Sequence, residues 1–218
     1  MSFTSSIADN LRLIRSQLPE HVTLIAVSKT KTNEEILEAY NAGQRDFGEN
    51  RVQELVPKYE ALPKDIRWHL IGHLQSNKVK YIAPFVHMIH SIDSEKLLAE
   101  VNKQAEKCNR VIPVLLQIFI AQEETKFGFS FEEASAVLSH SSEYTCTKIS
   151  GCMGMATNTD SETQIAAEFA SIHTFFEEQR KTFAELSTLS IGMSSDWQIA
   201  VENGSTMIRV GSSIFGIR

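Results

Sequence analysis

The chain has 218 residues, 42% of them hydrophobic, and a formal net charge of −6. This length and apolar content suffice for a substantial core, and we predict a single domain over residues 1–218. The negative charge and the scattered basic residues argue against nucleic acid and against an anionic membrane surface as partners. The longest nearly continuous apolar run, Val111–Ala121, is too short to span a bilayer.

The cysteines and the N-terminus bear on the compartment. Cys108, Cys146 and Cys152 are odd in number and match no metal-ligand spacing, which favours a reducing cytoplasm. The first residues contain no basic segment followed by an apolar core, so no secretory signal is expected. We therefore predict a cytoplasmic protein without a metal site. Cys152 is expected to be a small buried residue rather than a nucleophile.

Short apolar runs alternate with amphipathic segments along the whole chain. The segment Ser5–Gln17 is predicted to form an extra helix ahead of the first strand. Four Ser/Thr-x-x-Glu/Gln patterns predict helix starts with capping boxes, namely Thr32 with Glu35, Ser130 with Glu133, Thr159 with Glu162 and Ser195 with Gln198. The predicted strands are Val22–Val27, Arg45–Phe47, Arg67–Ile71, His87–Ile92, Ile112–Ile118, Lys148–Met153, Thr188–Gly192 and Thr206–Val210.

About eight strands that alternate with helices predict an α/β fold with a parallel sheet, and eight strands close naturally into a single (β/α)8 TIM-type barrel. The chain lies at the small end of the size range for that architecture. A doubly wound sheet of six or seven strands is therefore the rival fold. No repeat, low-complexity tract or flexible linker divides the chain, which agrees with one domain.

Lys29 follows the first predicted strand. The apolar, β-branched run Val22–Val27 carries one amine to the carboxyl end of that strand, where ligands bind in parallel barrels. An amine in a shielded pocket can form an imine with an aldehyde. A lysine at the start of a loop is otherwise an ordinary solvated group, so the residues at the other strand ends decide between the two interpretations.

Polar residues follow three other predicted strands. Asn50 comes after the second strand, Ser194 after the seventh, and Gly211 and Ser212 after the eighth. In such barrels, the loops after the last two strands often bind phosphate through backbone N–H groups and hydroxyls. Each Gly-Ser pair, Gly192 with Ser194 and Gly211 with Ser212, is alone more typical of a simple turn. Two such pairs at adjacent strand ends, with Lys29 at the same mouth, favour a phosphate site.

Arg209 lies within the last predicted strand, among Met207, Ile208 and Val210. Burying an unpaired arginine there is costly. It is therefore either a structural ion-pair partner or a donor to an anion or an aromatic ring nitrogen. His69 and His73 are four residues apart but fall on a strand and its end, so we do not expect them to converge on a metal. No zinc-protease, P-loop, dinucleotide-binding or nucleophile-elbow motif is present.

Together, these residues resemble those of the pyridoxal phosphate homeostasis proteins, a family whose barrel is similar to the N-terminal domain of alanine racemase. The resemblance covers nearly the whole chain and rests on five segments that occur in the same order. They are Ala26–Lys31, Phe47–Glu54, Trp68–Lys78, Gly192–Asp196 and Gly204–Gly216.

The resemblance implies a role for each candidate residue. Lys29 would form the internal aldimine with pyridoxal 5′-phosphate (PLP), and Asn50 would lie beside the cofactor ring. The phosphate would be held by Ser194, Gly211 and Ser212. Arg209 would face the pyridine nitrogen. The family commonly has threonine where this chain has Ser212, but a hydroxyl and a backbone N–H remain, so phosphate binding is expected.

The resemblance also implies PLP homeostasis rather than catalysis, with the cofactor buffered or delivered and amino-acid and keto-acid pools affected. Arg209 cannot accept a proton from a pyridinium nitrogen, so the ring nitrogen would stay largely unprotonated. An unprotonated ring is a poor electron sink. Racemisation also needs a second acid/base on the opposite face of the substrate. In alanine racemase-like enzymes this group is a tyrosine from a C-terminal β-domain of the partner subunit. Since the chain ends at Arg218, that domain is expected to be absent and the protein monomeric.

Three alternatives or extensions stay open. PLP-dependent apo-enzymes are possible recipients of the cofactor. A PLP-dependent amino-acid racemase or lyase that acts on a small substrate is the main alternative function. A phosphosugar-type barrel enzyme, in which Lys29 forms a Schiff base with a sugar carbonyl, is the third.

Overall fold

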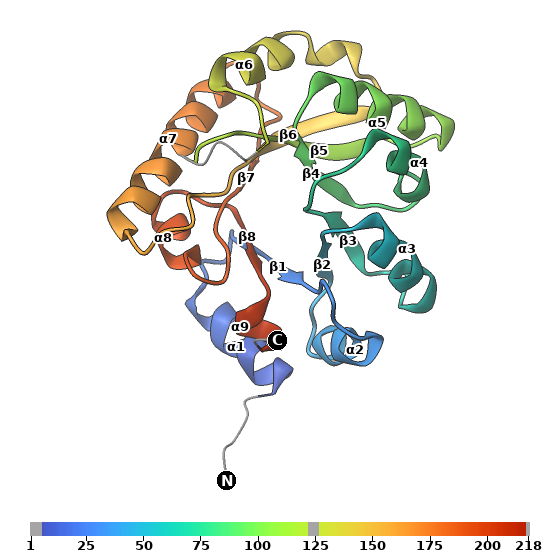
Figure 1. Ribbon diagram of the computed structural model, residues 1–218, viewed down its shortest axis with the longest axis vertical. Helices are drawn as coiled ribbons and strands as arrows, with labels where there is room; N and C mark the ends of the chain where they lie inside the picture. The colour runs from blue at the N-terminus through green and yellow to red at the C-terminus, as the bar shows by residue number, and fades with distance from the viewer. Residues whose placement is uncertain (1–5, 122–126, 217–218) are drawn as a thin grey trace.

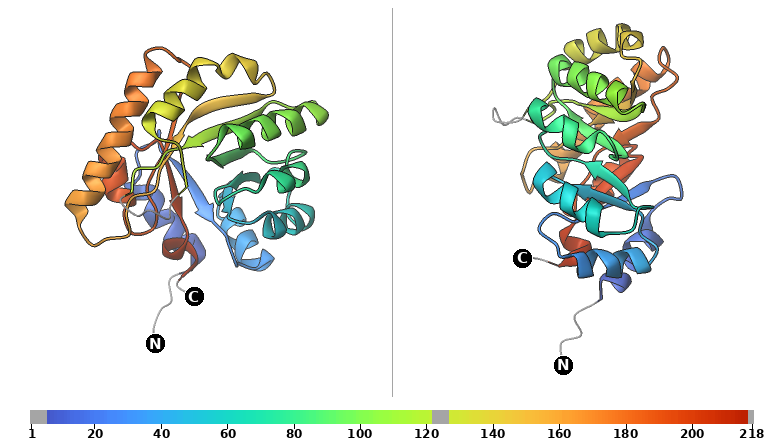
Figure 2. Two further views of the ribbon diagram at one scale, coloured as in Figure 1. Left: turned by 45° about the horizontal axis from the view of Figure 1, so that its top comes forward. Right: turned by 90° about the vertical axis from the view of Figure 1, so that its right-hand side faces the viewer.

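A computed structural model describes residues 6–121 and 127–216. Eight parallel strands form a closed barrel in the order in which they occur along the chain. The barrel closes where the first and last strands pair, with Thr23 beside Met207 and Ala26 beside Val210. Helices surround it on the outside (Figures 1 and 2). The (β/α)8 prediction is confirmed, and closure excludes the open, doubly wound sheet.

All eight strands begin and end within two residues of their predicted bounds, because each apolar run is bounded by turn residues that stop it. The second and seventh differ most. The second extends to Glu49, and the seventh ends at Ser190, two residues before Gly192. The strands are β1 Thr23–Val27, β2 Asp46–Glu49, β3 Arg67–Leu70, β4 Met88–Ile92, β5 Ile112–Gln117, β6 Thr147–Met153, β7 Thr188–Ser190 and β8 Met207–Val210.

The helices alternate with the strands, as the amphipathic segments predict. Two short 3₁₀ turns, Ser76–Lys78 and Ser141–Glu143, supplement them. The α-helices are α1 Ile7–Gln17, α2 Asn33–Asn41, α3 Val52–Ala61, α4 Val79–Ile82, α5 Glu95–Lys107, α6 Phe131–Ser139, α7 Glu162–Arg180, α8 Trp197–Glu202 and α9 Ser212–Phe215. Within the described ranges, no helix is long and apolar enough to cross a membrane.

Two of the four predicted capping boxes are confirmed. Those at Thr32 and Ser130 are complete, with both reciprocal hydrogen bonds. The other two predictions are wrong. The cap of α7 is Ser161, which accepts from the N–H of Gln164, because Ser161 immediately precedes the first helical residue, Glu162, whereas Thr159 lies two residues earlier. The α8 helix begins after Asp196, and no side chain of the described residues is seen to cap it.

The extra N-terminal helix is confirmed as α1. It packs beside α9, the last helix of the chain (Figure 1), and the Asn10 side-chain amide donates to the Ile214 carbonyl at 2.9 Å. Arg15 of the same helix donates to the carbonyl of Ala42, which follows α2. The helix therefore ties the beginning of the chain to its end beside the β1–β8 seam.

The core is divided into two parts. The larger part is a cluster of buried apolar side chains between the strands and the surrounding helices. The smaller part includes Ile25, Met88, Leu115, Met153 and Met207. Strand side chains alternate between the two faces of a sheet, so Arg209 shares the face of Met207. The barrel interior is thus mixed: apolar side chains lie there beside a buried arginine and, as described below, two buried histidines.

Candidate functional site

A cavity of about 540 Å³ opens at the carboxyl ends of the strands, within the size range of small-molecule sites. The loops after β1, β2, β7 and β8 contribute to it. All six residues singled out from the sequence line this one cavity, namely Lys29, Asn50, Ser194, Arg209, Gly211 and Ser212. Residues from opposite ends of the chain therefore meet at one mouth, as a parallel barrel requires.

Lys29 is exposed to solvent at this mouth, rather than shielded as the sequence led us to expect. Among the described residues, none forms a hydrogen bond or ion pair with its amine. Arg209 supplies a second cation, and no described residue that lines the cavity carries a carboxylate. The cavity therefore has a positive lining that suits an anionic ligand, although the net charge of the chain is negative.

The backbone around Lys29 is held in an unusual conformation. Thr30 has a φ of 64°, in the left-handed region that non-glycine residues rarely adopt. Its N–H donates to Glu54 Oε2 at 2.8 Å, and Glu54 lies on α3. This bond stabilises a tight turn of the backbone at Thr30, immediately after Lys29.

A buried ion pair secures the other side of Lys29. Lys58 Nζ donates to the Ser28 carbonyl at 2.8 Å and to Glu49 Oε1 at 2.7 Å. The Ser28 hydroxyl donates to the same carboxylate oxygen at 2.6 Å. Burial raises the pKa of Glu49, against the opposing effects of Lys58 and Ser28, and Glu49 Oε2 has no hydrogen-bond partner. The pair anchors the residue that precedes Lys29 to β2 and α3.

The loops after β7 and β8 are joined at the cavity. The Gly211 N–H donates to Ser194 Oγ at 3.0 Å, so this backbone donor already has an acceptor. A Cβ on Gly211 would lie 3.2 Å from the Val27 carbonyl oxygen, which explains why a residue without a side chain suits this close approach. The Ser194 hydroxyl proton remains available to a ligand.

Further donors come from backbone groups that side-chain chemistry does not reveal. In the described ranges, no hydrogen bond is found for the N–H groups of Ser194, Ser195, Ser212 and Ser213. Ser195 and Ser213 were not predicted to hold the phosphate. The sequence could have indicated them by their positions. Ser195 lies in a predicted turn and Ser213 in the first turn of a helix, where N–H groups lack intrahelical acceptors. Two adjacent loops thus present unpaired donors to the mouth, which is the arrangement that binds phosphate.

Arg209 is buried on the inner face of β8. Its Nη1 donates to the carbonyl of Ser190 at 2.7 Å and to the Ser190 hydroxyl at 2.6 Å, and its Nη2 donates to the Gly154 carbonyl at 2.9 Å. Burial lowers its pKa to about 10, with Asp196 acting in the opposite direction. The guanidinium is thus a cation at neutral pH that neutral oxygens hold in place.

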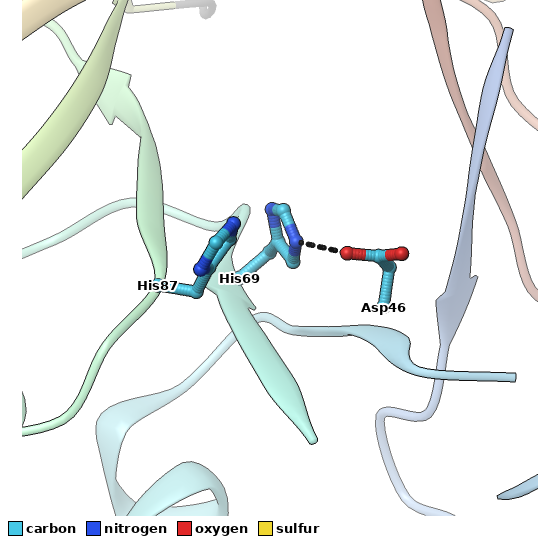
Figure 3. A group of neighbouring side chains, drawn as sticks. All are labelled: Asp46, His69 and His87. Carbon is cyan, nitrogen blue, oxygen red and sulfur yellow. Dashed lines mark hydrogen bonds and ion pairs between the residues drawn. The ribbon is translucent and has the colours of Figure 1, made fainter. Parts of the chain in front are cut away.

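The two histidines of the Trp68–Lys78 segment do not converge, as predicted. His73 Nδ1 lies 2.9 Å from the Asp93 carboxylate, whereas His69 Nε2 lies 3.1 Å from Asp46 Oδ1. His69 lies between Asp46 and His87 (Figure 3). Asp46, His69 and His87 offer atoms that could bind a metal ion, and these atoms lie within 4.8 Å of one another.

This group escaped the sequence analysis because β2, β3 and the residue before β4 bring it together. Arg67 binds both oxygens of Asp46, through Nε at 2.6 Å and through Nη2. Burial alone would raise the pKa of Asp46, but the bonds from Arg67 and His69 outweigh it and hold the pKa well below its usual range. The carboxylate is therefore already neutralised by a guanidinium.

Cys152 is fully buried in the apolar core, as predicted. Burial raises the pKa of its thiol to about 12. Because the thiolate is the nucleophilic form, this cysteine is unreactive at neutral pH.

A family profile described as "Alanine racemase, N-terminal domain" matches residues 4–218. The chain belongs to this family. It is also 40% identical, over 197 residues, to the pyridoxal phosphate homeostasis protein of Aquifex aeolicus, with 89% of this chain and 86% of that protein covered. The pyridoxal phosphate homeostasis protein of Escherichia coli K12 is 35% identical over 236 residues, with 98% and 97% of the two chains covered.

Solved structures show the same relationship. PipY of Synechococcus elongatus PCC7942 is 40% identical to this chain. The match covers 97% of this chain and 100% of PipY. The TM-score is 0.93 for PipY without PLP and 0.88 for PipY with PLP bound. Alanine racemase from Bartonella henselae is 16% identical with a TM-score of 0.72, which shows a shared barrel fold.

Proposed function

We propose that the protein binds PLP reversibly, as a Schiff base on Lys29, and acts in PLP homeostasis. The observation that carries this proposal is the composition of the cavity. An unpartnered primary amine lies at the same mouth as a group of unpaired hydroxyl and backbone N–H donors, with no carboxylate among the described lining residues. An aldehyde that carries a phosphate matches both features. Two relatives whose names refer to pyridoxal phosphate support the assignment.

Each lining residue has a role in this proposal. Ser194, Gly211 and Ser212, with the N–H groups of Ser195 and Ser213, would hold the phosphate. Asn50 would lie beside the ring. Gly72 holds the backbone of Asn50 in place. A Cβ on Gly72 would lie 2.4 Å from the Asn50 carbonyl oxygen, so the loops after β2 and β3 pack backbone against backbone.

Arg209 would face the pyridine nitrogen. It can only donate hydrogen bonds, so it leaves that nitrogen without a proton. Bound in this way, PLP would supply an aldehyde that exchanges between amines and would be a weak electron sink.

The cavity lining also favours a carrier over an enzyme. Among its described residues, Lys29 is the only general acid or base of the kind that racemases and lyases use, because none is a histidine, tyrosine, cysteine or carboxylate. Buffering or delivery of PLP, with effects on amino-acid and keto-acid pools, needs binding and release but no second base. We propose that the chain works in the cytoplasm as a monomeric single domain, with PLP-dependent apo-enzymes as possible recipients.

The test is covalent trapping. The protein is incubated with PLP and reduced with borohydride, and the modified peptide is located by mass spectrometry. We expect one adduct, on Lys29, and none in Lys29→Ala. Lys64→Ala is the matched control and should keep the adduct. A wild-type protein that forms no adduct, or one on another lysine, would contradict the proposal.

Turnover assays separate the carrier from the alternative function. The PLP-loaded protein is incubated with amino acids, and racemised or cleaved products are measured. We expect no turnover above that of free PLP. Steady racemase or lyase activity that disappears in Lys29→Ala would establish an enzyme instead.

A further inference from the structure

A line of polar side chains crosses the barrel interior from one mouth to the other. It begins at Asp46, the first residue of β2, and continues to His69 of β3. His69 Nδ1 lies 2.9 Å from Nε2 of His90, on β4. His90 Nδ1 lies 3.2 Å from the hydroxyl of Ser190, on β7, to which Arg209 donates. His90 and Ser190 are fully buried, so bulk solvent does not reach these contacts.

The Arg209 end sets a direction for this chain of hydrogen bonds. A guanidinium can only donate, so Ser190 Oγ is an acceptor toward Arg209. The hydroxyl proton of Ser190 then needs an acceptor of its own. Within the described residues, its only other contact is His90 Nδ1. Since a buried donor without an acceptor is costly, Ser190 donates to His90 Nδ1, which must be unprotonated.

The Asp46 end sets the same direction. Its carboxylate, held ionised by Arg67, can only accept, so His69 carries a proton on Nε2 and donates it at 3.1 Å. Burial, with the charge of Arg209, lowers the pKa of His90 well below its usual value. A neutral His90 with a bare Nδ1 carries its proton on Nε2, and this proton goes to His69 Nδ1. Both ends thus demand one tautomer for each histidine.

We propose that His90 is a positioning residue for the cofactor-facing arginine. With His69, it forms a one-directional hydrogen-bond chain from Asp46 to Ser190, and Ser190 determines which N–H groups Arg209 can offer to a ligand. Arg209 has five N–H donors. Three of them donate to the two Ser190 oxygens and the Gly154 carbonyl, which leaves two without an acceptor among the described residues. The inference rests on the proposed function only in that the ligand is PLP.

The first measurement uses the protein without PLP. Long-range proton–nitrogen NMR of the histidine side chains distinguishes the two neutral tautomers. We expect the Nε2–H tautomer for both His69 and His90. A His90 protonated on Nδ1, or a mixture of tautomers, would overturn the proposal whether or not the protein binds PLP.

A matched pair of variants then tests the link to Arg209. In His90→Asn, the shorter amide lies where Nδ1 was, keeps an acceptor for Ser190 and loses the bond to His69. In His90→Gln, the longer amide keeps the bond to His69 and loses the bond to Ser190. We expect His90→Asn to keep the wild-type Arg209 Nε–H resonance and His90→Gln to shift or broaden it.

The absorption spectrum of bound PLP provides the second readout of the pair. It should stay unchanged in His90→Asn and shift in His90→Gln. A purely structural role for His90 would make the two variants behave alike in the NMR and absorption measurements, and that result would overturn the proposal. Because the tautomer and arginine measurements need no cofactor, their failure is distinguishable from a failure to bind PLP.

Discussion

The two mouths of the barrel contain similar residue types but differ in how their hydrogen bonds are used. At the carboxyl mouth, the amine of Lys29 and the N–H groups of Ser194 and Ser212 have no partners among the described residues. At the amino mouth, Asp46 is bonded to Arg67 and His69. Polar groups alone therefore do not identify a binding site. The unpaired donors do, because they are the groups that a ligand can satisfy.

The largest expected effect tests the support of the carboxyl mouth. Lys58→Met would leave Glu49 buried without a cation, and we expect a loss of about 3–5 kcal/mol in the free energy of unfolding near neutral pH. The pKa of Glu49 is already raised by burial. A carboxyl with a folded pKa above its unfolded value contributes stability at low pH and loses it as the pH rises through the folded pKa.

Urea unfolding at two pH values tests this prediction. Lys58→Met should be less stable at about pH 8 than at about pH 5 relative to wild type. The control is the double variant Glu49→Gln/Lys58→Met, which has no carboxyl to ionise and should show little of this pH dependence. If the single and double variants depend on pH alike, Glu49 is not the group responsible.

The next effect tests the unpaired donors directly. Ser194→Ala removes a hydroxyl that can donate to the phosphate, and we expect PLP affinity to fall by about ten- to a hundredfold, since a hydrogen bond to a charged group contributes about 1.5–3 kcal/mol. Equilibrium dialysis with PLP measures the change. Ser187→Ala, at a position outside the cavity, is the control. An unchanged affinity in Ser194→Ala would place the phosphate elsewhere.

The smallest effect is expected at the amino mouth. Arg67→Met removes the guanidinium from Asp46, but the Arg67 side chain is 48% exposed, so solvent screens the pair. We expect a loss of about 1 kcal/mol or less in stability and no change in PLP affinity. Urea unfolding and equilibrium dialysis measure the two quantities. A large loss of PLP affinity would show that the hydrogen-bond chain from Asp46 to Ser190 depends on Arg67.

Much of the site could be predicted because Lys29, Asn50, Ser194 and Ser212 follow predicted strands directly. In a parallel barrel, the carboxyl ends of all strands meet at one mouth, so position along the chain becomes position in space. The exposure of Lys29 could not be predicted in this way. It depends on the turn at Thr30 and on the contact of that turn with α3, which is a tertiary interaction.

The sequence by itself determined the alternation of strands and helices, the eight-stranded barrel and six of the residues that line its cavity. These properties follow from local periodicity and from the order of the strands. Only the tertiary structure decided how the buried polar groups pair. Lys58 meets Glu49, and His69 meets His90, across strands and helices that no local pattern relates. Such pairs depend on register and on which face of each strand is turned inward, and both are settled only when the barrel closes.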